Sequence, residues 1–153
     1  MKTITYKNQI FEVDFDRTKE VYDNIQFSNL FSCNCHGCRN FLVNRENIYP
    51  KEVLNLMIQL GIDYKKGSEL HHICKIEIGK HLYGGWFHFK GRILENGNEL
   101  TETETIEVNE DFKFFFKRDG SLSFFDKEEH NQIMQLEILA HSDWVLEKEL
   151  ELD

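Results

Sequence analysis

Trp86-Phe87-His88-Phe89-Lys90-Gly91-Arg92-Ile93 alternates apolar and polar side chains with the period of two that a β-strand imposes. On a strand, Phe87, Phe89 and Ile93 share one face, and that face must be core. The opposite face carries a mixed aromatic and cationic stripe made of Trp86, His88, Lys90 and Arg92. The stretch therefore predicts a strand over 85–94 that is buried on one side.

The stripe of Trp86, His88, Lys90 and Arg92 is a candidate binding face. Aromatic and cationic groups together recognise anions or acidic peptides. The alternative is an amphipathic strand whose outer face is half covered by a helix. Both interpretations stay open at the level of the sequence.

Period-two patterning extends on both sides of this stretch from residue 69 onward. The predicted strands are 70–78, 85–94, 102–108, 112–117, 121–126 and 132–140. In the last of these, Glu137 and Leu139 face away from Leu136 and Ile138. Asn96-Gly97 and Asp119-Gly120 are tight-hairpin signals between alternating runs.

The N-terminal part predicts two short strands and two helices. The strands are 3–6 and 10–13, and the first helix covers 17–25 with Asp16 as its cap. The second begins at Pro50 and stops at Gly61.

These elements predict an α+β domain: a mostly antiparallel sheet meander with the two helices of the N-terminal half packed on one face. The length suits a single domain over 1–153. The predicted strands and helices do not alternate along the chain, so a nucleotide-binding parallel sheet is not expected.

Charge and composition limit the partners. The net charge is −9, from 27 acidic and 18 basic side chains, whereas nucleic-acid binding domains need Lys and Arg to neutralise phosphates. We therefore expect no nucleic acid and, if there is a partner, a basic protein. No apolar run is long enough to span a bilayer and the start lacks a signal-peptide pattern, so we expect a cytoplasmic protein with reduced thiols.

Three of the four cysteines lie within Cys33-Asn34-Cys35-His36-Gly37-Cys38. Cys35-x-x-Cys38 has the spacing of a zinc-binding knuckle, and Gly37 permits a tight turn between the thiolates. A fourth ligand is expected from the segment Glu69–Cys74. The candidate zinc ligands are Cys33, Cys35, Cys38, Cys74 and His72.

Two alternatives to zinc stay open. Cys35 and Cys38 beside Arg39 are candidates for a redox pair with a lowered thiol pKa, although the strand–helix context of a thioredoxin-like centre is missing. The other alternative is a set of reduced, inert thiols in a loop between Phe31 and Phe41.

The sequence contains no catalytic constellation. His141-Ser142-Asp143 has the residue types of a triad, but adjacent residues do not converge as a triad requires. Phosphate-binding loops, dinucleotide fingerprints, nucleophile elbows and HExxH are all missing. We predict no catalytic residues.

The chain resembles a group of small uncharacterised bacterial proteins over about residues 30–95. The resemblance rests on Cys33-x-Cys35-x-x-Cys38-x-Asn40-Phe41, on the helix from Tyr49-Pro50 to Leu60-Gly61-Ile62-Asp63, and on Tyr83-Gly84-Gly85-Trp86-Phe87-His88-Phe89-x-Gly91. It implies a bacterial cytosolic protein. Some similar small acidic proteins are immunity partners of secreted toxins.

Two function hypotheses follow. The first is a non-enzymatic binding protein of the immunity type, with a zinc ion pinning the cysteine segment. The second is a metal- or thiol-dependent enzyme that uses Cys33, Cys35 and Cys38.

Overall fold

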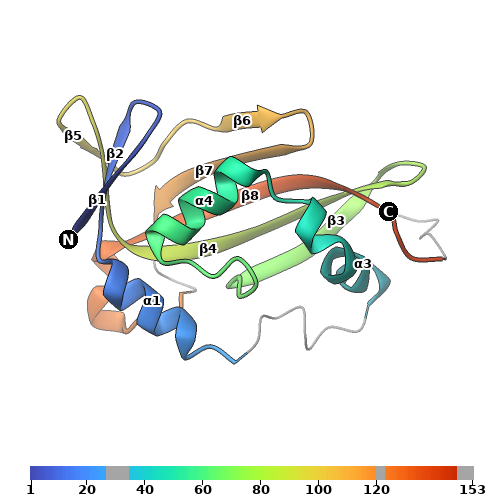
Figure 1. The fold of residues 1–153 in the computed structure, drawn as a ribbon, viewed down its shortest axis with the longest axis horizontal. Coiled ribbons are helices and arrows are strands. Elements are labelled where there is room, and N and C mark those ends of the chain that lie inside the picture. The colour runs from blue at the N-terminus through green and yellow to red at the C-terminus, as the bar shows by residue number, and fades with distance from the viewer. Residues whose placement is uncertain (27–34, 120–122, 148–153) are drawn as a thin grey trace.

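The computed structural model describes residues 1–26, 35–119 and 123–147. Its main feature is an eight-stranded sheet in which every pair is antiparallel. The strands are β1 Lys2–Tyr6, β2 Gln9–Val13, β3 Glu69–Glu77, β4 Lys80–Glu95, β5 Asn98–Leu100, β6 Ile106–Asn109, β7 Phe112–Arg118 and β8 Ile133–Asp143. The predicted α+β class with a mostly antiparallel sheet is confirmed (Figure 1).

The sheet is organised around β4, the longest strand. The path runs β1-β2-β4-β8-β7-β6, with β3 and β5 paired to β4 outside this path. β8 lies between β4 and β7, and from β8 the order runs backward along the chain to β7 and β6. Residues Lys80 to Lys90 of β4 pair with β8, from Asp143 to Ile133.

The other edge of β4 has two strand partners separated by a gap. β3 pairs with β4 as far as Trp86, and β2 takes over at Gly91. Helix α1, Phe15–Asp23, fills the gap: the N–H of His88 donates to the Tyr22 hydroxyl at 3.0 Å, and the N–H of Lys90 donates to Thr18 Oγ1 at 3.0 Å. The helix therefore satisfies backbone groups that would otherwise lie unpaired at a sheet edge.

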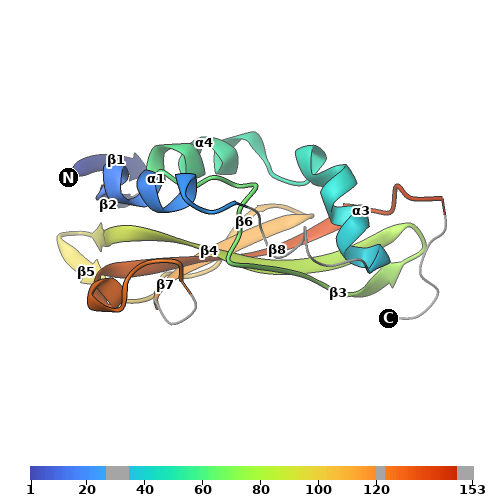
Figure 2. The same cartoon turned by 90° about the horizontal axis from the view of Figure 1, so that it is seen from below.

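The three α-helices of the described residues lie on one side of the sheet (Figure 2). They are α1, α3 His36–Asn44 and α4 Lys51–Leu60, accompanied by the 3₁₀ helices η1 Arg45–Asn47 and η2 Lys127–Gln132. The core between the layers is rich in aromatic residues and contains Phe41, Tyr49, Phe87, Phe89, Phe112, Phe114 and Phe116. Burial of Phe87 and Phe89 confirms the face assigned to them from the alternation.

Helix boundaries depend on capping. α1 begins two residues earlier than predicted because Asp14, and not Asp16, accepts a hydrogen bond from the N–H of Arg17. α4 follows Pro50 and ends at Gly61, which has φ of 86° in the left-handed region. The prediction for α4 is confirmed, with Pro50 in the capping position rather than the first turn.

The structure corrects the prediction in three places. The cysteine segment begins a helix, α3, where the sequence predicted a loop. The strand expected over 102–108 shortens to β6, with a single bridge between Glu102 and Lys117 before it. Residues 123–125 lie outside any strand, and Phe125 instead packs on Val21 and Ile133.

The predicted Asn96-Gly97 hairpin is confirmed, since both residues have positive φ between β4 and β5. Gly120, in the second hairpin signal, lies outside the described residues. Among the described residues, no helix has the length and apolar character needed to cross a membrane.

Candidate functional site

The cysteine segment forms the first turn of α3. Cys35 is the N-cap residue, and its sulfur accepts a hydrogen bond from the N–H of Cys38 at 3.3 Å. Cys38 is buried and Cys35 is exposed. Cys33 lies outside the described residues. The Cys35-x-x-Cys38 spacing thus has a structural role as a helix start.

Gly37 brings α3 into contact with β3. A Cβ atom on Gly37 would lie 2.7 Å from both Cβ and Cγ of His72, so only glycine permits this approach. The imidazole of His72 in turn lies 2.8 Å, Nε2 to Nδ1, from that of the buried His81. The structure therefore places His72 beside the cysteine turn.

Asn40, which follows the cysteines in the sequence motif, anchors α3 through its side chain. It is fully buried, its amide group donates to the Tyr83 hydroxyl at 3.2 Å and to the carbonyl of Asp143 at 3.1 Å, and its Oδ1 accepts from the N–H of Val145 at 2.7 Å. The Tyr83 hydroxyl donates to the carbonyl of Gly37 at 2.8 Å. These bonds fasten α3 to β4 and to the end of β8.

Cys74 lies apart from the other candidate ligands. It pairs with Leu82, whereas His72 pairs with Tyr83. Because consecutive residues of a strand face opposite sides, Leu82 and Tyr83 direct their partners to opposite faces of the sheet. Within the part of the chain that the structure describes, no group of three or more His, Cys, Asp or Glu side chains is arranged to hold a metal ion.

The stripe predicted on β4 separates into residues with different surroundings. His88 is buried, with Nδ1 2.8 Å from Ser68 Oγ and Nε2 2.9 Å from Gln135 Oε1. Burial lowers the pKa of His88 to about 4 despite the opposing effect of the Gln135 hydrogen bond. His88 is therefore a neutral side chain with both ring nitrogens engaged.

The two cations of the stripe form ion pairs. Lys90 lies 2.9 Å from Glu129, which also binds Arg17 at 2.8 Å. Arg92 contacts Glu12 at 2.5 Å and Glu99 at 3.4 Å. The stripe thus offers no row of unpaired cations.

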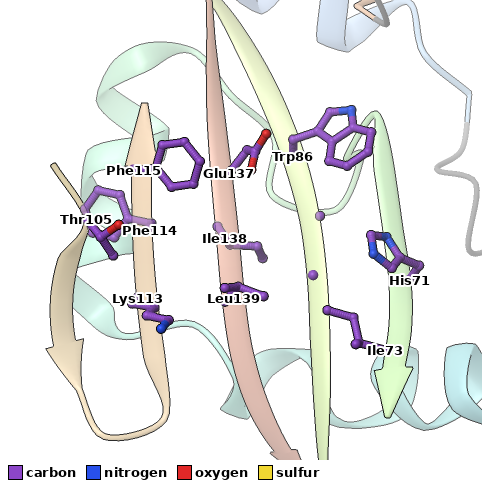
Figure 3. A pocket seen from close by; sticks show the side chains of 12 residues that line it. His71, Ile73, Trp86, Thr105, Lys113, Phe114, Phe115, Glu137, Ile138 and Leu139 are labelled. Carbon is purple, nitrogen blue, oxygen red and sulfur yellow. The ribbon is translucent and has the colours of Figure 1, made fainter. Parts of the chain in front are cut away.

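Trp86, the first residue of the stripe, lines a hollow on the sheet face opposite the helices (Figure 3). The hollow has a volume of about 270 Å³. Gly84 and Gly85 are among its lining residues. His71, Ile73 and Trp86 lie toward one side, and Lys113 and Phe115 lie toward the other (Figure 3). His71 Nδ1 is buried without a hydrogen-bond partner among the described residues, and so is Trp86 Nε1.

Strand register aligns acidic and aromatic side chains across this hollow. Glu69 pairs with Trp86, Trp86 with Glu137, and Glu137 with Phe115. Directly opposed residues point to the same face, and Figure 3 shows Glu137 between Trp86 and Phe115. We call Glu69, Trp86, Glu137 and Phe115 the acid–aromatic row.

Exposed acidic residues lie along the strand that borders β7, and we define Glu104, Glu107 and Glu110 as the acidic rim. These exposed residues lie on β6 and the segments flanking it, and Thr105 between them lines the hollow. None of the three forms an ion pair with another described residue. Among the described residues, the sheet face opposite the α-helices is left uncovered around the hollow, and it combines this aromatic hollow with negative charge on the neighbouring strand β6.

Sequence reasoning identified Trp86 but missed Phe115, His71 and Glu137 as its neighbours. The alternation in 132–140 does place Glu137 on the face away from Leu136. What the sequence lacks is the pairing of β8 with β4, which brings Glu137 beside Trp86.

Comparisons with known proteins add no relative: the chain matches no protein-family model, no curated protein and no solved structure.

Proposed function

We propose that the protein is a non-enzymatic binding protein of the immunity type, cytoplasmic and bacterial, which holds a basic protein partner on the uncovered face of its sheet. The observation that carries the proposal is the aromatic hollow beside the acidic rim of Glu104, Glu107 and Glu110. Apolar and aromatic concavities with a charged border are typical of protein-binding surfaces.

Charge supports a basic partner. The chain has a net charge of −9, and the rim residues have no ion-pair partner among the described residues. An unpaired acidic border steers a basic protein and adds association rate more than affinity. The resemblance to small acidic bacterial proteins favours the same class of partner.

The test compares two triple variants of equal charge. One carries Glu104→Gln, Glu107→Gln and Glu110→Gln at the rim. The matched control carries Asp16→Asn, Glu128→Gln and Glu147→Gln at exposed positions away from it. Each protein serves as bait in a lysate of the source organism, and every captured protein is purified and its binding measured by calorimetry at two salt concentrations.

We expect one basic protein to bind the wild type and the control at a fixed stoichiometry and to bind the rim variant at least tenfold more weakly. If the purified partner binds the rim variant as tightly as the control, the uncovered face is the wrong surface. Recovery of the unpartnered monomer at low salt overturns the binding function itself.

Zinc at the start of α3 is a second part of the proposal. Cys35, Cys38 and His72 are the described candidates for such a site, and Gly37 seats the cysteine turn against His72. Their side chains do not form a group arranged to hold a metal ion, so zinc binding requires them to reorient. A zinc ion would fasten α3 to β3. This role is structural, because the hollow lies on the opposite face of the sheet.

Elemental analysis of protein purified under reducing conditions tests the zinc site. We expect one zinc per chain, lost in Cys38→Ser and retained in the control Cys74→Ser, since Cys74 and His72 face opposite sides of the sheet. Wild-type protein without zinc, or equal zinc in both variants, contradicts the site.

A further inference from the structure

The acid–aromatic row points to the chemistry of the group that enters the hollow. Trp86 and Phe115 flank Glu137 on three paired strands, β4, β8 and β7. Glu69 lies on the other side of Trp86. Carboxylates therefore alternate with aromatic rings along one line of the sheet.

Glu137 retains an unoccupied acceptor. Gln135 donates to its Oε1 at 2.7 Å, and Lys117 lies 3.2 Å from the same oxygen. Both of these contacts fall on Oε1, which leaves Oε2 to solvent or to a partner. The side chain of Glu137 is 26% exposed, so a partner has access to it.

The hollow leaves room above the sheet for a side chain to enter. Gly84 has no Cβ, so Ile73 and His71 pack directly over its backbone, and the hollow beside them measures about 270 Å³. Such a volume accommodates a single long side chain between the two walls. A purely apolar side chain would leave the Oε2 of Glu137 facing it without a donor, which is unfavourable when water is excluded.

We propose that the hollow holds a guanidinium group of the partner, an arginine side chain that stacks against Trp86 and Phe115 and donates to Glu137 Oε2. A planar guanidinium satisfies both neighbours at once, since it stacks on aromatic faces and donates to carboxylates. This inference rests on the proposed function and names the anchoring residue of its basic partner. His71 Nδ1 is buried without a hydrogen-bond partner among the described residues, and it is a further acceptor in the tautomer that carries the proton on Nε2.

The test uses N-acetyl-arginine amide as the probe and N-acetyl-citrulline amide as its neutral isostere. The readout is the indole N–H signal of Trp86 in a ¹H–¹⁵N spectrum. The chain has two tryptophans, so Trp144→Phe identifies the Trp86 signal. We expect saturable shifts with the arginine probe at about millimolar concentration and none with the citrulline probe.

Substitutions locate the binding. Glu137→Gln should weaken the arginine probe at least tenfold, and Phe115→Leu about threefold. The control Glu128→Gln, on η2, should leave the affinity within twofold. The probe affinity of Glu137→Gln counts only if the signal dispersion of its ¹H–¹⁵N spectrum matches that of the folded wild type. If this variant does not fold, the probe affinity of Phe115→Leu decides.

Equal shifts with citrulline, or unchanged affinity in both row variants, overturns the arginine anchor. That failure is distinguishable from failure of the proposed function. If the purified basic partner no longer binds the rim variant, but the arginine probe does not bind the wild type, only the arginine anchor is rejected. If the probe binds and its binding depends on Glu137, but the purified partner binds the rim variant as tightly as the control, only the basic-partner surface is rejected.

Discussion

The hydroxyl oxygen of Tyr22 accepts the backbone N–H of His88 over 3.0 Å, and this bond connects α1 to the centre of β4. The N–H lies in the gap where β3 has ended and β2 has not begun. A tyrosine side chain thus occupies the place of a neighbouring strand.

Tyr22→Phe removes this acceptor and leaves the ring in place. The buried N–H of His88 then has no partner, which should lower the free energy of unfolding by about 1–3 kcal/mol. Urea titration followed by circular dichroism measures the change. As a control, Tyr64→Phe removes an exposed hydroxyl bonded to Glu46 and should cost less than about 0.5 kcal/mol. Equal costs in both variants would show that the edge bond has no special weight.

His88 makes stability depend on pH. Burial lowers its pKa to about 4 in the folded chain, whereas an unfolded histidine titrates near 6.5. The unfolded state therefore binds the proton first, and stability is fully present above about pH 6.5 and falls as the pH drops toward 4. The loss from this group should reach about 2 kcal/mol at pH 5.

Urea titrations of the wild type and His88→Gln between pH 8 and pH 5 measure this effect. In His88→Gln, the free energy of unfolding should depend less on pH than in the wild type, because the His88 contribution is gone. The exposed control His36→Gln should keep the pH dependence of the wild type. Parallel pH dependences in the wild type and His88→Gln would contradict the assignment to His88.

Asn40 joins three parts of the chain through side-chain bonds to Tyr83, Asp143 and Val145. Asn40→Ala deletes all three and orphans buried groups, so we expect a loss of about 2–4 kcal/mol in unfolding free energy. Thermal and urea unfolding measure it. The neighbouring exposed Arg39→Ala should change stability by less than about 0.5 kcal/mol, and a comparable loss there would argue against the buried network.

Glu129 is the counter-ion of two cations. It lies 2.8 Å from Arg17 and 2.9 Å from Lys90, and its own side chain is 13% exposed. The Arg17 hydrogen bond lowers the pKa of Glu129 to about 2, so its contribution is present above about pH 4.5 and is lost as the pH falls through 2. At pH 7, Glu129→Gln should cost about 1–3 kcal/mol.

The adjacent exposed Glu128→Gln is the control for this effect, and it should leave stability within about 0.5 kcal/mol in the same urea titration. If both variants unfold at the same urea concentration, the ion pairs around Glu129 contribute nothing measurable.

Local patterns in the sequence were sufficient for the elements whose physics is local. The alternation around Phe87 and Phe89 determines which face of β4 is buried, and Pro50 and Gly61 mark the limits of α4. The start of α3 escaped prediction because its cap is a cysteine sulfur, a weaker acceptor than the usual Ser, Thr, Asp or Asn.

The candidate site depends on contacts that no local pattern encodes. Trp86 stood out within its own strand, but its neighbours come from β8 and β7, and their register follows from pairing across about fifty residues of chain. The alternation placed Lys90 on a cationic face, but in the structure it forms an ion pair with Glu129 of η2. The sequence alternation predicted which face of β4 each residue occupies, but it did not predict which residues of the neighbouring strands lie beside them.

The placement of β8 between β4 and β7 bears on how the chain folds during synthesis. The β6–β7 hairpin reaches the rest of the sheet through β8, with which β7 pairs from Phe112 to Arg118. Residues 2–95 can emerge from a ribosome and form hairpins, and the segment after β5 bonds to β7 through Thr101 and Thr103. The long strand between β4 and β7 is nevertheless missing until Ile133–Asp143 is free to insert. Closure therefore waits for a strand made late, and contacts of such high sequence separation favour slow folding. Until then the apolar edges of both halves are exposed to other chains, so the nascent protein passes through an interval in which chaperone binding competes with aggregation.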